Sequence, residues 1–174
     1  MIKKQKIIID HLHGPLEVSS SFNYTVKSIK ACDTTEIVKY SIKNYNEYED
    51  VFDRKTANEH RRESIFTRII RINMDYVSPI IGLLYVIGDN SYYIGHLSVH
   101  NNFRRQGLAK MMLSSLAEFI KVDNRYKTVS LTVHRDNTDA IDLYESIGFK
   151  NVDNKVYTTM EISTTDFIES ILRI

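Results

Sequence analysis

The spacing of apolar residues changes twice between residues 92 and 133, and this change constrains the fold more than any other feature of the chain. Residues 92–99 (YYIGHLSV) have the aromatic and β-branched character of a strand. From Leu108 to Ile120 the apolar residues recur at the spacing of an amphipathic helix. Residues 128–133 (TVSLTV) again resemble a strand. This order predicts a βαβ unit, in which the two strands are parallel.

Further elements are predicted on both sides of this unit from periodicity, capping residues and turn residues. In chain order they are a strand at 22–30, helices at 33–45 and 47–61, strands at 64–73 and 79–87, a turn at 88–91, a helix at 138–146, strands at 149–152 and 156–162, and a helix within 163–174. The strands at 64–73, 79–87 and 92–99 are expected to be antiparallel. With the βαβ unit they predict a mixed α/β fold of the α+β kind.

The length and charge of the chain limit its organisation and its partners. The 174 residues fit one domain, 1–174, with residues 1–20 as an N-terminal extension. No apolar run is long enough to cross a membrane. The net charge is +1, which speaks against a nucleic-acid scaffold. The single cysteine, Cys32, and the absence of a signal-peptide pattern at the start lead us to expect a cytoplasmic protein.

A basic turn lies between the first strand of the βαβ unit and its helix. A helix N-terminus carries unpaired N–H groups and partial positive charge, and Gly107 allows an anion to approach the backbone. Arg104, Arg105 and Lys110 add positive charge for a pyrophosphate. Neither the Walker pattern nor G-x-G-x-x-G is present. The residues expected to bind an anionic cofactor here are Leu97, Ser98, Val99, Arg104, Arg105, Gln106, Gly107, Leu108, Ala109 and Lys110.

Two motifs in this order resemble those of the Gcn5-related N-acetyltransferases, the GNAT superfamily. Arg104-x-x-Gly107-x-Ala109 resembles the pyrophosphate loop of that family, [QR]-x-x-G-x-[GA]. Residues 131–150 (LTVHRDNTDAIDLYESIGFK) are similar to its strand, Asn, helix, Tyr and Gly-Phe segment. The resemblance covers roughly residues 80–162. It implies a GNAT fold, with a mostly antiparallel mixed sheet of about six to seven strands, about four flanking helices and a splayed parallel pair.

The resemblance also implies a reaction. Acetyl-CoA is the expected co-substrate, and its pantetheine arm would insert between the parallel strands and hydrogen-bond the backbone of Leu97 and Val99. A backbone N–H near Val99 would face the thioester oxygen. The acceptor amine attacks directly, so Cys32 need not act as a nucleophile. His11 and His13 lack further spaced ligands, and no metal site is expected.

Tyr144 is the expected general acid. A tyrosine, with a pKa of about 10, stays protonated at neutral pH and can donate to the departing thiolate. Asn137 lies seven residues earlier on the same helix face. The resemblance implies that it contacts the cofactor arm beside the tyrosine. Each residue has a plainer interpretation by itself: Asn137 as a helix N-cap, Tyr144 as a core aromatic residue, and the arginine turn as a solvated helix start.

The acceptor and the general base are less constrained. Family members that acetylate protein N-termini carry Glu or His where this chain has Thr132, and the hairpin at Asn154 and Lys155 is short for a loop that clamps peptides. Both features favour a small-molecule amine over a protein N-terminus or a lysine. His96 is a candidate base, although alternation places it on the face opposite Leu97. An acidic and aromatic cluster suits a cationic amine or is a solvated turn, and it comprises Tyr45, Glu47, Tyr48, Glu49 and Asp50.

Two rival functions and one further partner stay open. A GNAT-like module that binds acyl-CoA without catalysis is favoured by the missing base and opposed by Tyr144. A nucleic-acid-binding domain that uses the arginine turn and the basic start is opposed by the near-zero net charge. A homodimer is common in the superfamily, and the apolar tail could contribute to it.

Overall fold

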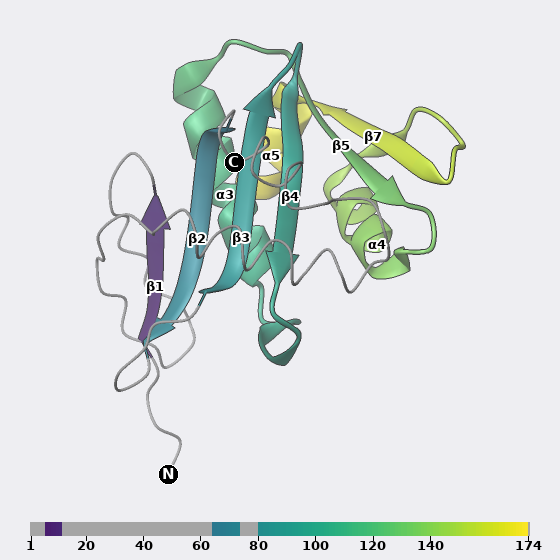
Figure 1. Cartoon of the computed structure of the whole chain (residues 1–174). Helices are drawn as coiled ribbons and strands as arrows, with labels where there is room; N and C mark the ends of the chain where they lie inside the picture. The colour runs from purple at the N-terminus through teal and green to yellow at the C-terminus, as the bar shows by residue number, and fades with distance from the viewer. Residues whose placement is uncertain (1–5, 12–63, 74–79, 174) are drawn as a thin grey trace.

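A single sheet organises the chain. The computed structural model describes residues 6–11, 64–73 and 80–173, with side chains at 64–70 and 80–173. The sheet has seven strands in the order β1-β2-β3-β4-β5-β7-β6 (Figure 1). The strands are β1 (Lys6–His11), β2 (Ser64–Asn73), β3 (Ile80–Gly88), β4 (Tyr92–Val99), β5 (Thr128–His134), β6 (Lys150–Asn151) and β7 (Tyr157–Ser163). The helices of this part of the chain are η1 (Asn101–Phe103), α3 (Leu108–Asp123), α4 (Thr138–Ile147) and α5 (Thr164–Leu172).

The two faces of the sheet carry separate apolar clusters. Helices α3 and α5 cover one face, where Leu84 of β3 and Leu131 of β5 pack in one core with Leu116 of α3 (Figure 1). The apolar stripe of α3 forms this contact, and its buried members are Leu108, Met112, Leu113, Leu116, Ala117 and Ile120. The opposite face carries a smaller cluster that includes Leu83 and Tyr85. The amphipathic pattern of α3 therefore fixes how this helix packs on the sheet.

Strands β4 and β5 are the parallel pair of the βαβ unit, and they pair over a short distance only. Their register joins Tyr92–Ile94 of β4 to Val129–Leu131 of β5, and β4 continues to Val99 without a partner residue on β5. Figure 1 shows the two strands diverging beyond this point. The predicted parallel arrangement and the splay are both confirmed. The divergence leaves a gap between β4 and β5 that side chains and backbone groups can line.

A β-bulge in β4 changes which residues face the helices. Tyr85 of β3 pairs with His96, whereas the next residue, Val86, pairs with Ile94, so Gly95 is the extra residue. Before the bulge Ile94 faces the large core, and after it Val99 does. His96 therefore lies on the opposite face, beside the smaller cluster. A Cβ at position 95 would meet the Tyr85 ring at 2.6 Å, so the bulge requires glycine.

Most predicted elements in the described residues are confirmed within a few residues. The expected mixed fold and the antiparallel order of β2, β3 and β4 are correct. Strand β1 was not predicted: residues 6–11 fall within the expected N-terminal extension, and they pair with β2. The strand expected at 22–30 and the helices expected at 33–45 and 47–61 lie outside the described residues. Among the helices that the structure describes, none is both long and apolar enough to span a bilayer.

Candidate functional site

The edge of β4 that faces the gap exposes backbone hydrogen-bonding groups. His100 donates its N–H to Ile81 O on the neighbouring strand at 2.7 Å. Because backbone direction alternates along an antiparallel strand, Leu97 and Val99 point their N–H and C=O groups the other way, into the gap. The Val99 carbonyl accepts a hydrogen bond from Arg104 Nε at 2.9 Å. Part of this edge is therefore open to an extended ligand, whereas the Val99 carbonyl is already bonded to Arg104.

The turn after β4 ends at the N-terminus of α3. Gly107 is the N-cap residue of α3, with φ 77°, and in the described part of the chain this helix has no side-chain cap hydrogen bond. Arg105 also has a positive φ, 60°. A Cβ at Gly107 would meet nothing within 4 Å, so glycine is needed there for its backbone conformation rather than for space. The uncapped N–H groups and the helix dipole make this end of α3 suitable for an anion.

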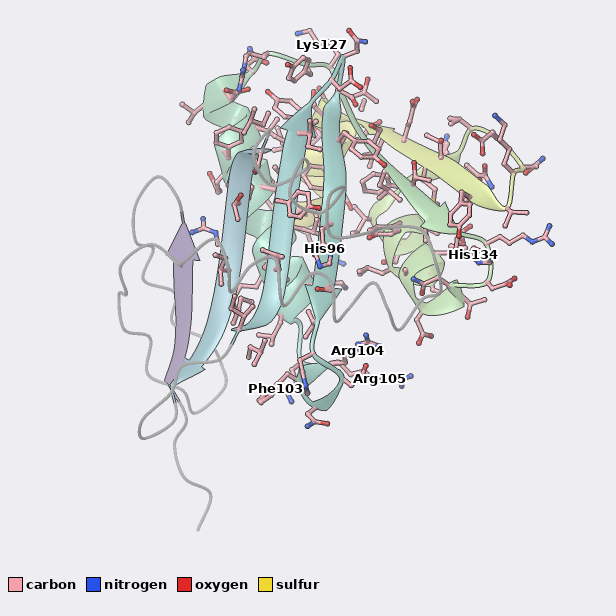
Figure 2. The ribbon with its side chains drawn as sticks, in the orientation of Figure 1. His96, Phe103, Arg104, Arg105, Lys127 and His134 are labelled. Carbon is pink, nitrogen blue, oxygen red and sulfur yellow. The ribbon has the colours of Figure 1, made fainter. Side chains whose placement is uncertain are left out.

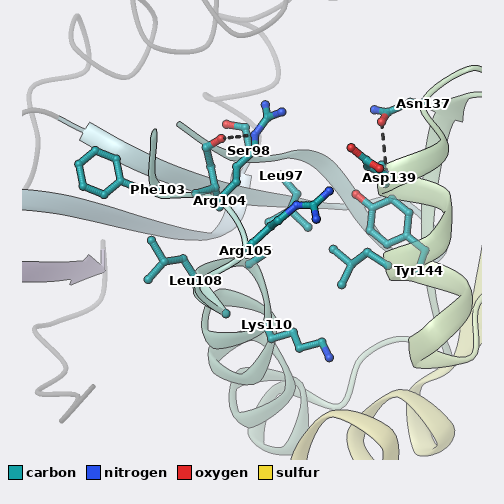
Figure 3. Close-up of a pocket in the computed structure, with 15 residues that line it drawn as sticks. Leu97, Ser98, Phe103, Arg104, Arg105, Leu108, Lys110, Asn137, Asp139 and Tyr144 are labelled. Atoms are coloured by element: carbon teal, nitrogen blue, oxygen red, sulfur yellow. Dashed lines mark hydrogen bonds between the residues drawn. The ribbon is translucent and has the colours of Figure 1, made fainter. Parts of the chain in front are cut away.

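A cavity of about 530 Å³ connects the open edge of β4, the α3 N-terminus and α4 (Figure 3). It contains most of the residues that the two motifs single out, although they are separated by up to 47 positions in the chain. Its lining residues are Leu97, Ser98, Val99, Phe103, Arg104, Arg105, Gly107, Leu108, Ala109, Lys110, Asn137, Asp139, Ala140, Leu143 and Tyr144. Gln106 lies in the same turn, between Arg105 and Gly107, which both have a positive φ. It does not line the cavity.

Four residues of the lining were not expected from the sequence. Ala140 and Leu143 could have been found, because they fall on the face of the helix that also carries Asn137 and Tyr144. Phe103 lies in η1, and its ring contacts that of His100, with centroids 5.9 Å apart. The remaining residue, Asp139, is exposed in the first turn of α4, and no spacing rule indicates that it faces the basic turn.

Asn137 begins α4 and also lines the cavity. Its side-chain oxygen accepts a hydrogen bond from the N–H of Ala140 at 3.3 Å, which is the N-cap interaction of α4 (Figure 3). The plainer interpretation from the sequence is therefore confirmed. The amide NH₂ does not take part in this bond, so capping and a contact with a ligand are compatible in one side chain.

Tyr144 lies on α4 at the inner end of the cavity. The residue is 7% exposed, and its ring packs on Phe149 with centroids 5.6 Å apart. Figure 3 shows its hydroxyl directed toward the cavity. The Arg105 side chain reaches toward the same cavity from the opposite wall. Tyr144 is thus both a member of the core and a lining residue, and the two interpretations of it do not exclude one another.

His96 is placed unfavourably for a general base. It is buried on the face opposite Leu97, stacks on Tyr85 with centroids 5.6 Å apart, and shares a 2.6 Å hydrogen bond with Ser98 Oγ. Burial lowers its pKa from the usual 6.5 to about 3. His96 is neutral at physiological pH and does not line the cavity. Figure 2 shows it within the sheet, away from Arg104 and Arg105.

His134 and the possible metal ligands also have ordinary settings. His134 ends β5, with its ring edge-on to Tyr157 at 4.9 Å, and its Nδ1 accepts the N–H of Asp136 at 3.1 Å. Within residues 64–70 and 80–173, no group of three His, Cys, Asp or Glu side chains is arranged to hold a metal ion. The polar groups that line the described cavity are backbone groups, cations, an amide, a carboxylate, a phenol and the hydroxyl of Ser98.

Comparison with curated proteins gives partial matches to N-acetyltransferases. The chain is 35% identical over 78 residues to GCN5-related N-acetyltransferase 6, chloroplastic, of Arabidopsis thaliana, and 32% identical over 77 residues to human N-acetyltransferase 8B. The matches cover 44% and 42% of this chain, and only 27% and 34% of the length of those relatives.

Solved structures share the fold at low identity. NAA60 of Arabidopsis thaliana, in complex with a bisubstrate analogue, matches with a TM-score of 0.62 and 16% identity over 77% of this chain and 95% of that one. A GNAT family acetyltransferase of Elizabethkingia anophelis with acetyl-CoA bound matches with a TM-score of 0.58 and 13% identity, over 91% and 98% of the two chains. The model of the acetyltransferase (GNAT) family matches residues 34–149, more than half of the sequence. The chain belongs to the acetyltransferase (GNAT) family.

Proposed function

We propose that the chain is an N-acetyltransferase that transfers the acetyl group of acetyl-CoA directly to a primary amine, with Tyr144 as general acid. One observation carries this proposal: a single cavity joins the open edge of β4, the uncapped N-terminus of α3 and the Tyr144 side chain. These are a site for an amide-containing arm, a site for phosphates and a proton donor. Membership of the GNAT family makes acetyl-CoA the natural co-substrate.

The two ends of acetyl-CoA suit different walls of the cavity. The backbone groups of Leu97 and Val99 can pair with the amides of the pantetheine arm as a further strand would. The NH₂ of Asn137 can donate to a carbonyl of the same arm. The pyrophosphate fits the first N–H groups of α3, with Arg105 and Lys110 close by. The charged residues of the lining are exposed and Tyr144 is buried, which supports phosphates at the mouth and the thioester inside.

The proposed reaction needs a donor for the leaving thiolate. The neutral amine attacks the thioester carbon, a C–N bond forms, and the C–S bond breaks. A backbone N–H near Val99 stabilises negative charge on the carbonyl oxygen. The Tyr144 hydroxyl donates its proton to the sulfur and regains one from water. The protons that the amine loses pass to solvent, because His96 is buried with a pKa of about 3.

A small-molecule amine is the proposed acceptor. Thr132 is exposed on β5 and offers no carboxylate or imidazole for a peptide N-terminus. Hydrogen bonds hold the hairpin between β6 and β7. Thr158 Oγ1 lies 2.7 Å from Asn151 Oδ1 and 2.5 Å from the Asp153 carbonyl, and its one proton is donated to either acceptor; Asp153 Oδ1 accepts the Thr159 N–H at 3.0 Å. A short and internally bonded hairpin of this kind favours a compact acceptor over a peptide that must be clamped.

Free-thiol release from acetyl-CoA, measured with a panel of amines, tests the proposal. The panel contains polyamines, amino sugars, amino acids, and peptides with a free N-terminus or an internal lysine, and a reaction without amine is the control. Release that depends on an amine identifies the acceptor class. Calorimetric titration with acetyl-CoA is run in parallel. Binding without release for any amine would favour the non-catalytic module, and absence of binding would contradict the proposal.

We extend the proposal to the whole chain as one domain, 1–174, that acts in the cytoplasm, alone or as a homodimer. The continuous sheet from β1 to β7 supports the single domain, because residues 6–11 pair with a strand that begins at residue 64. The single cysteine supports a reducing compartment. Light scattering of the purified chain measures its oligomeric state.

A further inference from the structure

Among the described residues that line the cavity, one is a carboxylate, and it lies at the mouth together with three cations. Arg104, Arg105 and Lys110 line the cavity and are exposed, and they come from the turn after β4 and the start of α3. Asp139 lines the same cavity from the first turn of α4 and is also exposed. Figure 3 shows Asp139 and Arg105 reaching toward the cavity from opposite walls. A bound ligand would therefore lie between the carboxylate and the cations.

A carboxylate at this place opposes the binding of phosphates. The nucleotide end of acetyl-CoA carries a pyrophosphate and a 3′-phosphate, and like charges across a cavity repel. CoA, the product, carries the same phosphates as the substrate. Repulsion from Asp139 thus weakens the binding of both substrate and product. It also shortens the residence time of CoA after transfer.

We propose that Asp139 weakens the binding of the nucleotide end of the co-substrate and so speeds CoA release. This inference rests on the proposed function, because it takes acetyl-CoA as the ligand. Asp139 acts on the phosphates and not on the thioester, because Asp139 is exposed at the mouth of the cavity whereas Tyr144 is buried at its inner end.

Asp139 has a second effect that a control must separate. An acidic residue in the first turn of a helix stabilises that helix through its dipole. Asp166 occupies the first turn of α5, is exposed, and does not line the cavity. Asp166→Asn removes the same helix-dipole contribution and the same charge from the chain. It is therefore the matched control for Asp139→Asn.

The test measures dissociation constants of the two variants and the unaltered chain for three probes: acetyl-CoA, acetyl-dephospho-CoA and S-acetyl-pantetheine. For an exposed charge pair we expect Asp139→Asn to bind acetyl-CoA roughly 3-fold more tightly. Affinity for CoA should rise by the same factor. The gain should be smaller with acetyl-dephospho-CoA, absent with S-acetyl-pantetheine, and largely lost in about 0.5 M NaCl, where charges are screened. Asp166→Asn should change none of these constants.

Three results would overturn the inference. Weaker binding of acetyl-CoA by Asp139→Asn would mean that the carboxylate accepts a hydrogen bond from the adenosine. An equal gain with S-acetyl-pantetheine, or an equal gain in Asp166→Asn, would remove the phosphates as the cause. If the unaltered chain binds none of the three probes, the proposed function itself fails, and this outcome is distinct because it does not depend on either variant.

Discussion

A Cβ atom at Gly95 would lie 2.6 Å from Cε2 of Tyr85, so the bulge in β4 and the ring beside it are matched to each other. Gly95→Ala should therefore cost about 1–3 kcal/mol of the free energy of unfolding, the usual range for overpacking. It should also weaken acetyl-CoA binding, because the bulge sets the direction of β4 beyond Ile94. Urea denaturation measures the stability. In a Tyr85→Leu background the cost of Gly95→Ala should shrink, and a cost that stays unchanged would contradict the steric explanation.

Tyr144→Phe should lower kcat by about 10²-fold or more while leaving the dissociation constant of acetyl-CoA nearly unchanged. The hydroxyl is the only group removed, and the ring still packs on Phe149. Tyr157→Phe is the matched control, since Tyr157 is 40% exposed on β7 and does not line the cavity. An unchanged kcat in Tyr144→Phe would remove Tyr144 from the role of general acid.

Two substitutions of Asn137 should separate its capping role from its proposed contact with the cofactor arm. Asn137→Ser keeps a side-chain oxygen for the Ala140 N–H but loses the NH₂ group, so stability should stay near that of the parent while acetyl-CoA binds less tightly. Asn137→Ala should lose both the cap and the NH₂ group, and its free energy of unfolding should fall by about 1 kcal/mol. Thermal melts and titrations distinguish the effects. Equal affinity in Asn137→Ser and the parent would leave Asn137 with capping alone.

The positive charge of Lys110 should strengthen the binding of the acetyl-CoA phosphates, whereas that of Lys127 should have no effect on it. Both lysines are exposed, but only Lys110 lines the cavity. Figure 2 places Lys127 at the far end of the sheet from Arg104 and Arg105. Lys110→Gln should raise the dissociation constant of acetyl-CoA by about 5-fold and reduce its salt dependence. A similar change in Lys127→Gln would show a general effect of net charge instead of a local one.

Burial of His96 should make the fold sensitive to acid. The pKa of His96 is about 3 in the folded state, below the 6.5 of an exposed histidine, so the unfolded chain binds the proton more readily. This contribution to stability is complete above pH 6.5 and is lost as the pH falls toward 3. Between pH 7 and about pH 4 the parent should therefore lose more stability than His96→Gln. Parallel losses in urea denaturation across that range would contradict the burial of a neutral His96.

Local patterns in the sequence predicted the βαβ unit and the ends of α4, the helix that follows it. The apolar stripe of α3, Asn137 as a cap and Gly148 as the left-handed end of α4 each depend on neighbours within one or two turns. The bulge was missed, although it leaves a trace in the sequence. Apolar residues alternate at Tyr92 and Ile94, and the alternation then shifts by one residue at Gly95.

The sequence by itself determined the family motifs, the order of the elements and the conformations that glycine and asparagine impose at helix ends, because these depend on residues close together along the chain. Only the tertiary structure decided that β4, α3 and α4 enclose one cavity, that His96 is buried away from it, and that Asp139 faces the basic turn. Burial and electrostatic interactions depend on distance through space. Arg105 and Asp139, which are far apart in the sequence, line one cavity because β4 and β5 pair only as far as Ile94 and Leu131.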